Sequence, residues 1–371
     1  MLPVGCSALS VGRLWDWPGM SVPAAAPLGN RTEVVGALHL HTRHSDGTAE
    51  AAGLAVAAAG AGLDFVVVND HDTLAVRSAG GEGWHGRVLI AAGTEVTAAS
   101  RCHLLAHGNS SAPARGALGV PEVLGWVAAE GGRVYAAHPH GRGLHGFRRL
   151  LDDWPHWGDA RLGGLELWNY LQDWAERFRW WQPASYRLEE IAARIQGPPQ
   201  WLLDRWDLEA ARRPFPAICG NDNHAKQPPL AATTFFPHDA LIGRLVCRVR
   251  LERPLPADGP AAVRELFAAL GAGRSLIARQ ELASAAGFDF RVESPDGRAF
   301  RPGDPAAFAA GARAAVESPR EAELAVVAGG RTVASGRGRR LEADLEGPAP
   351  VRAEARLDGK AWVFTNHVRF G

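Results

Sequence analysis

The 371-residue chain has few cysteines, and they are far apart. Cys6, Cys102, Cys219 and Cys247 form no CxxC pair, which argues against a disulfide framework and against a thiolate zinc site. Isolated cysteines are typical of reduced, mostly buried thiols, so we expect a cytoplasmic protein. The chain also lacks a run of 18 apolar residues, and we expect no transmembrane helix.

The sequence has no excess charge of either sign. Lys and Arg together number 40, and Asp and Glu together also number 40, so the net charge is zero. Without a basic excess there is no electrostatic reason to expect nucleic acid or a membrane surface as a partner. Selectivity for a charged ligand must therefore come from a local site.

The first residues lack the features of a targeting segment. They contain no basic start followed by an apolar run, so we expect no secretory signal peptide. We predict that residues 1–30 form a loose leader, within which Met20 is an alternative start.

Seven short apolar runs recur between residues 34 and 222, and helical stretches separate many of them. Runs that are apolar throughout are typical of strands buried on both faces. Their alternation with helices predicts an α/β fold with parallel strands, either a barrel or a doubly wound sheet, over residues 31–240. The runs cover residues 34–41, 64–70, 87–93, 103–108, 133–139, 162–169 and 216–222.

Residues 151–213 differ in composition, because they hold eight of the 13 tryptophans. Prolines break this stretch, and we predict a helical insertion between the last two strands. One interpretation is a helical cap with its own small core. The other is a wall over the mouth of a site, which would set substrate choice.

The C-terminal part predicts a different kind of structure. Residues 241–281 form a connecting segment with one strand and a helix at about 259–270. From 282 to 371 short strand-like runs are joined by Gly, Pro and Asp turns, which predicts a small all-β sandwich-like domain. We expect its arginine-rich stretch, 330–340, to be a solvated turn.

Nearly every apolar run between residues 34 and 222 carries a histidine or a carboxylate near one end. His39 and His41 alternate along a strand, so they are expected to face the same way. Ten of the 14 histidines lie between residues 39 and 145, and barrel enzymes assemble their sites from strand ends in this manner. The candidate donors are His39, His41, Asp46, His71, Glu95, His103, His138, Asp222 and His224.

Imidazoles and carboxylates without thiolates suit zinc, manganese or iron. Nine donors exceed the three or four protein ligands of one catalytic zinc. We therefore expect two or three divalent ions, with a carboxylate bridging two of them.

Six motifs, in this order, resemble those of the PHP superfamily, named for polymerase and histidinol phosphatase. They are HLHTRHSDG (39–47), NDHD (69–72), GTE (93–95), the first histidine of CHLLAHG (102–108), AHPH (137–140) and GNDNH (220–224). The resemblance covers about residues 34–225. It implies a distorted (β/α)7 barrel, a trinuclear metal centre and the hydrolysis of phosphoesters.

The resemblance also implies a division of the donors among three ions. His39, His41, Glu95 and Asp222 would hold the first. Glu95 would bridge to a second ion that is also held by His103 and His138, with His107 as an alternative to His103. Asp46, His71 and His224 would hold the third, and Asp46 stands where some relatives have a histidine.

The downstream half is similar to one branch, the CehA/McbA-type metallohydrolases, which include a carbaryl hydrolase. The similar segments are GLELWN (164–169), GNDNH (220–224), AALGAGRSLIA (268–278) and the FTNHVRF end. No polymerase or helix-hairpin-helix segment is present, which argues against the polymerase-linked members.

The implied reaction is attack of a metal-bound hydroxide, formed from a metal-bound water, on a small anionic phosphoester. Arg142 and Lys226 follow metal motifs and would bind the phosphate, or else are solvated surface charges. His140 is either a proton donor to the leaving group or a residue that orients a ligand.

Two other functions stay open at this point. One is hydrolysis of an uncharged carbamate, ester or amide on the same fold. The other is a non-catalytic metal-binding scaffold. An exonuclease is disfavoured by the zero net charge, and the sequence does not determine the oligomeric state.

Overall fold

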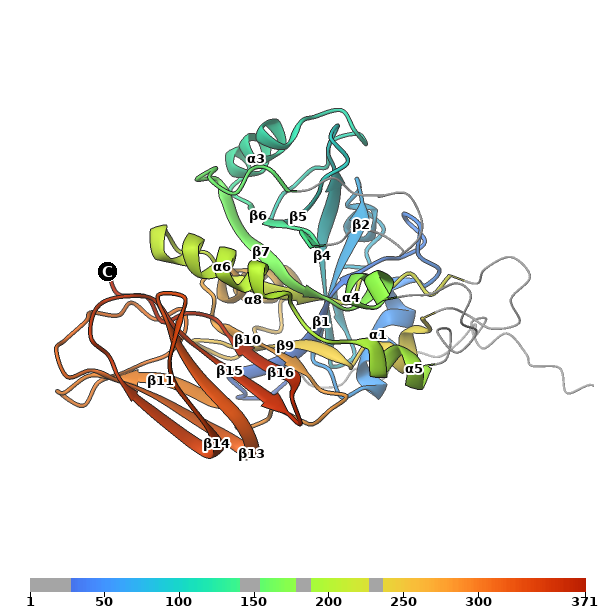
Figure 1. Ribbon diagram of the computed structural model, residues 1–371. Coiled ribbons are helices and arrows are strands. Elements are labelled where there is room, and N and C mark those ends of the chain that lie inside the picture. Colours follow the sequence, from blue (N-terminus) through green and yellow to red (C-terminus); the bar gives the residue numbers. More distant parts are fainter. Residues whose placement is uncertain (1–27, 141–153, 178–187, 227–235) are drawn as a thin grey trace, which may run out of the picture.

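The computed structural model describes residues 28–140, 154–177, 188–226 and 236–371, which form a mixed α/β structure around one large sheet (Figure 1). Within these ranges, no helix has the length and apolar character needed to cross a bilayer. The helices are α1 (Ala51–Gly60), α2 (Ala75–Ser78), α3 (Val120–Ala129), α4 (Tyr170–Arg177), α5 (Leu188–Arg194), α6 (Gln200–Arg212), α7 (His238–Leu241) and α8 (Gly259–Gly271).

Each of the seven predicted runs contains a strand. These strands are β1 (Glu33–Leu40), β2 (Phe65–His71), β4 (Val88–Thr97), β5 (His103–His107), β6 (Arg133–Ala136), β7 (Leu162–Asn169) and β8 (Ala217–Gly220), with a short β3 (Gly83–His85) beside β4. β2 and β4 are buried at every position except His71, which explains their continuous apolar sequences.

The seven strands follow one another in the sheet as β1-β2-β4-β5-β6-β7-β8. All neighbours are parallel except the two pairs that include β5, which is antiparallel to both β4 and β6. The end of β8 also bonds to the end of β1, because Asn221 N donates to Leu38 O at 2.9 Å and Asp222 N to His39 O at 2.7 Å. The first and last strands of the series therefore lie side by side.

The Trp-rich region contains both a strand and helices. β7 lies inside residues 151–213, and the helical part of this region begins at Tyr170 with α4 and continues with α5 and α6. Trp174 and Trp206 are buried in the main core cluster, so this region packs as part of the protein interior.

The C-terminal strands extend the same sheet. They are β9 (Leu245–Arg250), β10 (Ser275–Arg279), β11 (Asp289–Glu293), β12 (Ala299–Phe300), β13 (Arg313–Ala328), β14 (Arg331–Asp344), β15 (Val351–Leu357) and β16 (Lys360–Thr365). β9 pairs with β1 and β10 with β16, so the path of hydrogen-bonded strands runs without a break from the C-terminal region into the site-bearing strands.

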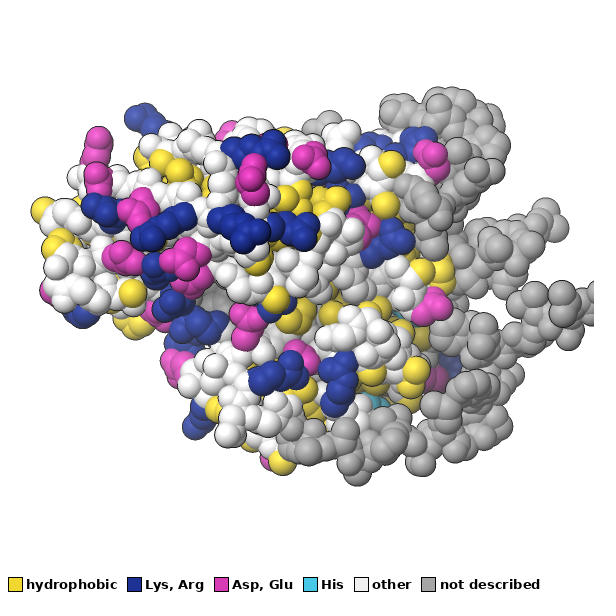
Figure 2. All heavy atoms as spheres, turned by 90° about the horizontal axis from the view of Figure 1, so that it is seen from below, with side chains coloured by type: hydrophobic (Ala, Val, Ile, Leu, Met, Phe, Trp, Pro, Cys, Tyr) yellow, Lys and Arg dark blue, Asp and Glu magenta, His cyan; other side chains and the backbone are white. Residues whose placement is uncertain are grey.

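The arginine-rich stretch 330–340 is not a solvated turn, and that expectation was wrong. It forms most of β14, whose partner is β13. The turn is confined to Gly329 and Gly330, with φ of 55° and 78°, and such a two-residue glycine loop suits a tight hairpin. Exposed charges of both signs cover this region (Figure 2), as in the pair of Arg337 with Glu321 at 2.7 Å.

Helix α6 is fastened to the C-terminal strands by a buried ion cluster. Asp207 accepts hydrogen bonds from Arg352 Nε at 2.6 Å and Nη2 at 2.8 Å, and its Oδ1 lies 2.7 Å from His367 Nε2. Burial raises the pKa of Asp207, but the bonds from Arg352 and His367 outweigh burial and lower this pKa to about 2. The contribution of Asp207 to stability is therefore present above its unfolded-state pKa and is lost as the pH falls toward 2.

We expect Asp207→Asn to lower the free energy of unfolding by about 1–3 kcal/mol at pH 7, because Arg352 and His367 would lose the buried carboxylate that they share, although Arg352 keeps its pair with Glu354. Urea denaturation measures this change. The exposed pair offers a control, since Arg337→Gln should cost less than about 1 kcal/mol. Equal effects of the two substitutions would contradict the assignment of this cluster as the junction between α6 and the sheet.

Candidate metal centre

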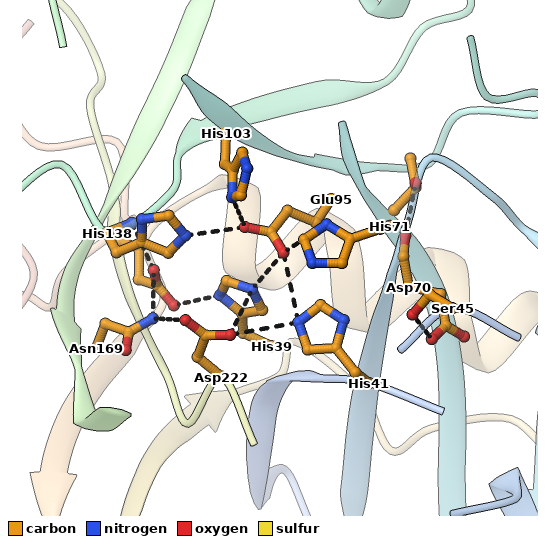
Figure 3. Close-up of polar contacts among 12 residues, drawn as sticks. His39, His41, Ser45, Asp70, His71, Glu95, His103, His138, Asn169 and Asp222 are labelled. Carbon is orange, nitrogen blue, oxygen red and sulfur yellow. Dashed lines mark hydrogen bonds and ion pairs between the residues drawn. The ribbon is translucent and has the colours of Figure 1, made fainter. Parts of the chain in front are cut away.

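The nine candidate donors lie at one end of the strand series, and Figure 3 labels seven of them, all except Asp46 and His224. The carboxyl ends of the parallel strands meet there, and β5 runs in the opposite direction, so it brings its first residue, His103, to the same end. His39, His71 and Glu95 lie within β1, β2 and β4, and the loops after β1, β6 and β8 carry the remaining donors. The structure brings into contact His39, His41, Asp46, His71, Glu95, His103, His138, Asp222 and His224.

Three of these donors have backbone conformations that residues with side chains rarely adopt. The φ angle is 58° at His39, 27° at His138 and 53° at Asp222. The register of β1 against β2 shifts between Ala37 and Leu40, so His39 lies in a bulge. The expected cause of convergence, regular strand alternation, was therefore wrong. Strain of about 1–3 kcal/mol per residue of this kind is concentrated at functional sites.

The most buried group consists of His39, His41, Glu95 and Asp222. Nε2 of His39 lies 3.1 Å from Oε2 of Glu95. Nε2 of His41 lies 3.4 Å from this oxygen and 3.4 Å from Oδ1 of Asp222. Two ligand atoms that are each about 2.1 Å from a tetrahedral ion are about 3.4 Å apart, so these spacings fit one divalent ion.

A second group differs from the set implied by the family resemblance. His71, Glu95 and His103 form it, with His71 Nδ1 3.3 Å from Glu95 Oε2 and His103 Nδ1 2.8 Å from Glu95 Oε1. His138 lies next to this group, since its Nε2 is 2.9 Å from Glu95 Oε1. His107, the alternative to His103, is buried elsewhere and stacks on Phe267 with ring centroids 4.7 Å apart.

The third group lies on the open side of the cluster. Asp46, His71 and His224 belong to it, and His41 joins them. Nε2 of His224 lies 3.1 Å from Oδ1 of Asp46, and the rings of His41 and His224 stack at 4.1 Å. The side chain of Asp46 is 42% exposed, so this group is the most accessible to solvent.

Several donor atoms of the cluster are buried without a hydrogen-bond partner in the described parts of the chain. They are Nε2 of His39, both ring nitrogens of His41, Nδ1 of His71 and Oε2 of Glu95. An unsatisfied buried polar atom costs about 1–3 kcal/mol, so folded proteins rarely leave one alone. Divalent ions would satisfy these atoms together, and the residues therefore fit a metal centre.

The protonation states of Glu95, Asp222 and His41 suit cations. Burial raises the pKa of Glu95 and of Asp222, but the surrounding histidines hold both pKa values well below the usual range. Burial lowers the pKa of His41 to about 4, and the charge of His224 adds to this effect. Burial lowers the pKa of His39, His103 and His224, but the nearby carboxylates outweigh burial and raise it. Because ionised carboxylates and neutral imidazoles are the forms that bind metals, metal binding would release protons from these three histidines.

Glu166 is not one of the nine donors, but it contacts two of them, His39 and His138. Its Oε1 lies 2.8 Å from Nδ1 of His39, and its Oε2 accepts hydrogen bonds from His138 N at 2.7 Å and Asn169 Nδ2 at 3.0 Å. A carboxylate in this position orients a metal-binding imidazole and leaves its Nε2 available. Gly220 is needed beside it, because a Cβ at 220 would lie 1.7 Å from Glu166 Oε1.

Asp70 fixes the loop that carries Asp46. It accepts hydrogen bonds from Thr42 N at 2.7 Å and from Thr42 Oγ1 at 2.6 Å. It also accepts one from Ser45 Oγ at 2.6 Å (Figure 3). The acidic residue of the NDHD motif that precedes His71 therefore has a structural role.

A cavity of about 380 Å³ opens over the cluster. Arg101 and Arg115 line it near His103, and Leu171 and Gln172 of α4 line it near Asp222. Gly116 N donates to Thr97 O at 2.9 Å, which holds the loop of Arg115 against β4. Arg101 has a φ of 61°, an unfavourable angle that glycine would adopt without strain.

The sequence analysis missed both arginines, because they stand in turns rather than in strand-end motifs. Of the residues predicted to contact substrate, Arg142 lies outside the described residues. Lys226 forms an ion pair with Asp46, with its Nζ 2.6 Å from Oδ2. His140 is buried with its Nδ1 3.5 Å from Glu176 Oε1, and it does not line the cavity.

No protein-family model and no curated protein matches the chain. Solved structures with a similar fold have low sequence identity. A two-domain protein from Bacteroides vulgatus containing a predicted PHP-like metal-dependent phosphoesterase is 14% identical, with a TM-score of 0.43 over 91% of this chain and 95% of that one. A putative metal-dependent phosphoesterase from Bifidobacterium adolescentis is 19% identical, with a TM-score of 0.34 over 55% and 93%.

An amidohydrolase from Chromobacterium violaceum is 14% identical, with a TM-score of 0.32 over 51% of this chain and 87% of that one. With TM-scores below 0.5, these likenesses carry no functional argument. The function is therefore argued from the geometry of the site.

We expect His41→Ala to remove at least one bound ion per chain, because His41 belongs to two of the three groups. Metal content after dialysis against zinc or manganese, measured by inductively coupled plasma mass spectrometry, tests this. His44→Ala is the matched control, since His44 is an exposed histidine of the same loop and belongs to none of the groups. Unchanged metal content in His41→Ala would refute the centre.

Proposed function

We propose that the chain is a metal-dependent hydrolase of the PHP type, most active on small phosphoesters. In this proposal the seven strands from β1 to β8 form the distorted (β/α)7 barrel, and the cluster holds two or three ions of zinc, manganese or iron. One observation carries the proposal: donors from separate strand ends converge, and several of their buried atoms have no hydrogen-bond partner among the described residues.

The residues of the chain have separable tasks in this reaction. Bound divalent ions would act as Lewis acids and lower the pKa of a water molecule. Glu95 and Asp222 supply ionised oxygens to the centre, and Glu166 keeps His39 oriented by a bond to Nδ1. The positive φ angles of His39 and Asp222 direct these side chains toward the centre, so their positions are set before a substrate binds.

Charge favours an anionic substrate. The positive charge of two or three divalent ions exceeds the negative charge of the three carboxylates in the cluster, Asp46, Glu95 and Asp222. Arg101 and Arg115 add two guanidinium groups to the same cavity, and guanidinium binds phosphate oxygens in a planar, bidentate manner. The cavity volume of about 380 Å³ suits a small molecule.

Hydrolysis of an uncharged carbamate, ester or amide is the second candidate, and it follows from the resemblance to the CehA/McbA branch. Leu171 favours it, because this side chain gives the cavity an apolar wall on the side of α4. The two candidates differ in whether the arginines matter for binding.

We expect the chain, supplied with Mn²⁺ or Zn²⁺, to hydrolyse p-nitrophenyl phosphate or its bis-ester faster than naphthyl carbamates. Arg115→Gln should raise KM for the phosphate roughly tenfold with a smaller change in kcat, because a charge-assisted hydrogen bond is lost. KM for a carbamate should not change in this variant.

Steady-state kinetics on both substrate classes measures these values. Turnover of the carbamate alone would establish the second candidate. If neither class is turned over while metal content is full, the chain is a metal-binding scaffold and the proposal fails.

A further inference from the structure

A second cavity, of about 700 Å³, lies at the opposite end of β8 from the metal centre. Its lining comes from the segment before β8, from the end of α8, and from the C-terminal segments 298–307 and 366–371. Arg133, at the start of β6, also lines it. We call it the junction cavity, because residues of the site-bearing part and of the C-terminal region both line it. The four-residue strand β8 spans about 13 Å, so the substrate cavity and the junction cavity are separate places.

Two arginines of the junction cavity have no acidic partner among the residues that the structure describes. Arg133 Nη1 donates to Gly163 O at 2.9 Å, and Arg369 Nε donates to Ala210 O at 2.6 Å. Neither side chain forms an ion pair with a carboxylate in the described parts of the chain. Arg298, which also lines the cavity, is paired with Asp296 at 2.7 Å. Partly buried guanidinium groups are normally paired, so two unpaired ones in one cavity indicate a place for an anion.

The structure makes room for the guanidinium of Arg133. A Cβ at Gly271 would lie 2.7 Å from its Nε, and a Cβ at Gly163 would lie 2.5 Å from its Cγ. Any larger residue at either position would displace the side chain. Arg369 is held in a partly buried place, and burial without a counter-charge lowers the pKa of its guanidinium.

The rest of the cavity lining is largely apolar, which indicates that the ligand also has an apolar part. Phe215 and Phe300 face the cavity together with Pro214, Pro216 and Pro305. Among the described lining residues, Asp304 has the one carboxylate side chain, and it forms an ion pair with Arg250. Aromatic rings and prolines around a pair of cationic groups suit a flat apolar body that carries one anionic group.

We propose that the junction cavity binds a small organic anion, with a phosphate-like or carboxylate group on Arg133 and Arg369 and a ring between Phe215 and Phe300. This proposal does not rest on the proposed hydrolase function. The ligand would join the two parts of the sheet, because Arg133 begins β6 while Arg369 and Phe300 belong to the C-terminal region.

Phenylphosphonate is a suitable probe, since it carries a ring and a phosphate-like group and has no phosphoester to hydrolyse. We expect isothermal titration calorimetry of the full chain to show one site that persists in His41→Ala, and we expect the probe to raise the melting temperature. A further site that is lost in His41→Ala would be the metal centre. Arg133→Gln and Arg369→Gln should each raise Kd at least tenfold. Arg264→Gln, an exposed arginine of α8 that does not line the cavity, should leave Kd unchanged.

Two further variants keep the test decisive. Ala307→Trp obstructs the cavity at an exposed lining position and leaves both arginines in place, so it should also abolish binding. His41→Ala should bind the probe normally. Inorganic phosphate should bind at least tenfold more weakly, since it lacks the ring.

The opposite results would overturn the proposal. No binding at millimolar phenylphosphonate excludes the site. Loss of binding in His41→Ala with retention in Arg369→Gln would place the probe in the metal centre instead. Equal affinity for inorganic phosphate would exclude a ring-bearing ligand.

Discussion

The carboxylate of Glu95 is the interaction on which the candidate centre depends. Its Oε2 lies within 3.4 Å of ring nitrogens of His39, His41 and His71, and its Oε1 lies within 2.9 Å of His103 and His138. These five histidines lie at or just beyond the ends of β1, β2, β5 and β6. The side chain of Glu95, on β4, therefore contacts residues from four other strands of the series. One carboxylate cannot form a well-aligned hydrogen bond with each of five imidazoles. Some of the ring nitrogens around Glu95 therefore remain available to bind cations.

Strand β1 connects this centre to the rest of the sheet. Its first half pairs with β9, through which the sheet continues to the C-terminal strands, and its last residues bond to the segment after β8. The C-terminal region also fixes the start of β8, because Asn366 Oδ1 accepts a hydrogen bond from Ala217 N at 2.7 Å. His39 and Asp222 therefore owe their positions partly to strands that carry no donor.

Much of the site could be predicted from the sequence, because its donors stand in local motifs at strand ends. The motifs predicted His39, His41 and Asp222 as neighbours, but the bulge at His39 depends on how β1 pairs with β2, which the sequence of β1 does not reveal. The grouping of His71 with His103 also depends on tertiary geometry. The sequence did not predict that Arg101 and Arg115 line the cavity, since arginines in turns are usually solvated.

The fold, too, could be predicted from the sequence only where local patterns determine it. The Gly-Gly and Asp-Gly turns of the C-terminal strands were visible in the sequence, and both are hairpins in the structure. β14 was not visible, because its Arg, Ser and Gly residues lack a strand-like pattern and it is held by pairing with β13. The continuity of the sheet through β9 and β10 is a property of strand pairing, which no local pattern specifies.

Anomalous diffraction from crystals grown with manganese or zinc tests the central claim most directly. We predict an anomalous peak about 2.1 Å from Nε2 of His39, Nε2 of His41, Oε2 of Glu95 and Oδ1 of Asp222, with at least one more peak beside His71. Crystals of metal-supplemented protein that show no peak at this cluster, or peaks only elsewhere, would contradict the account.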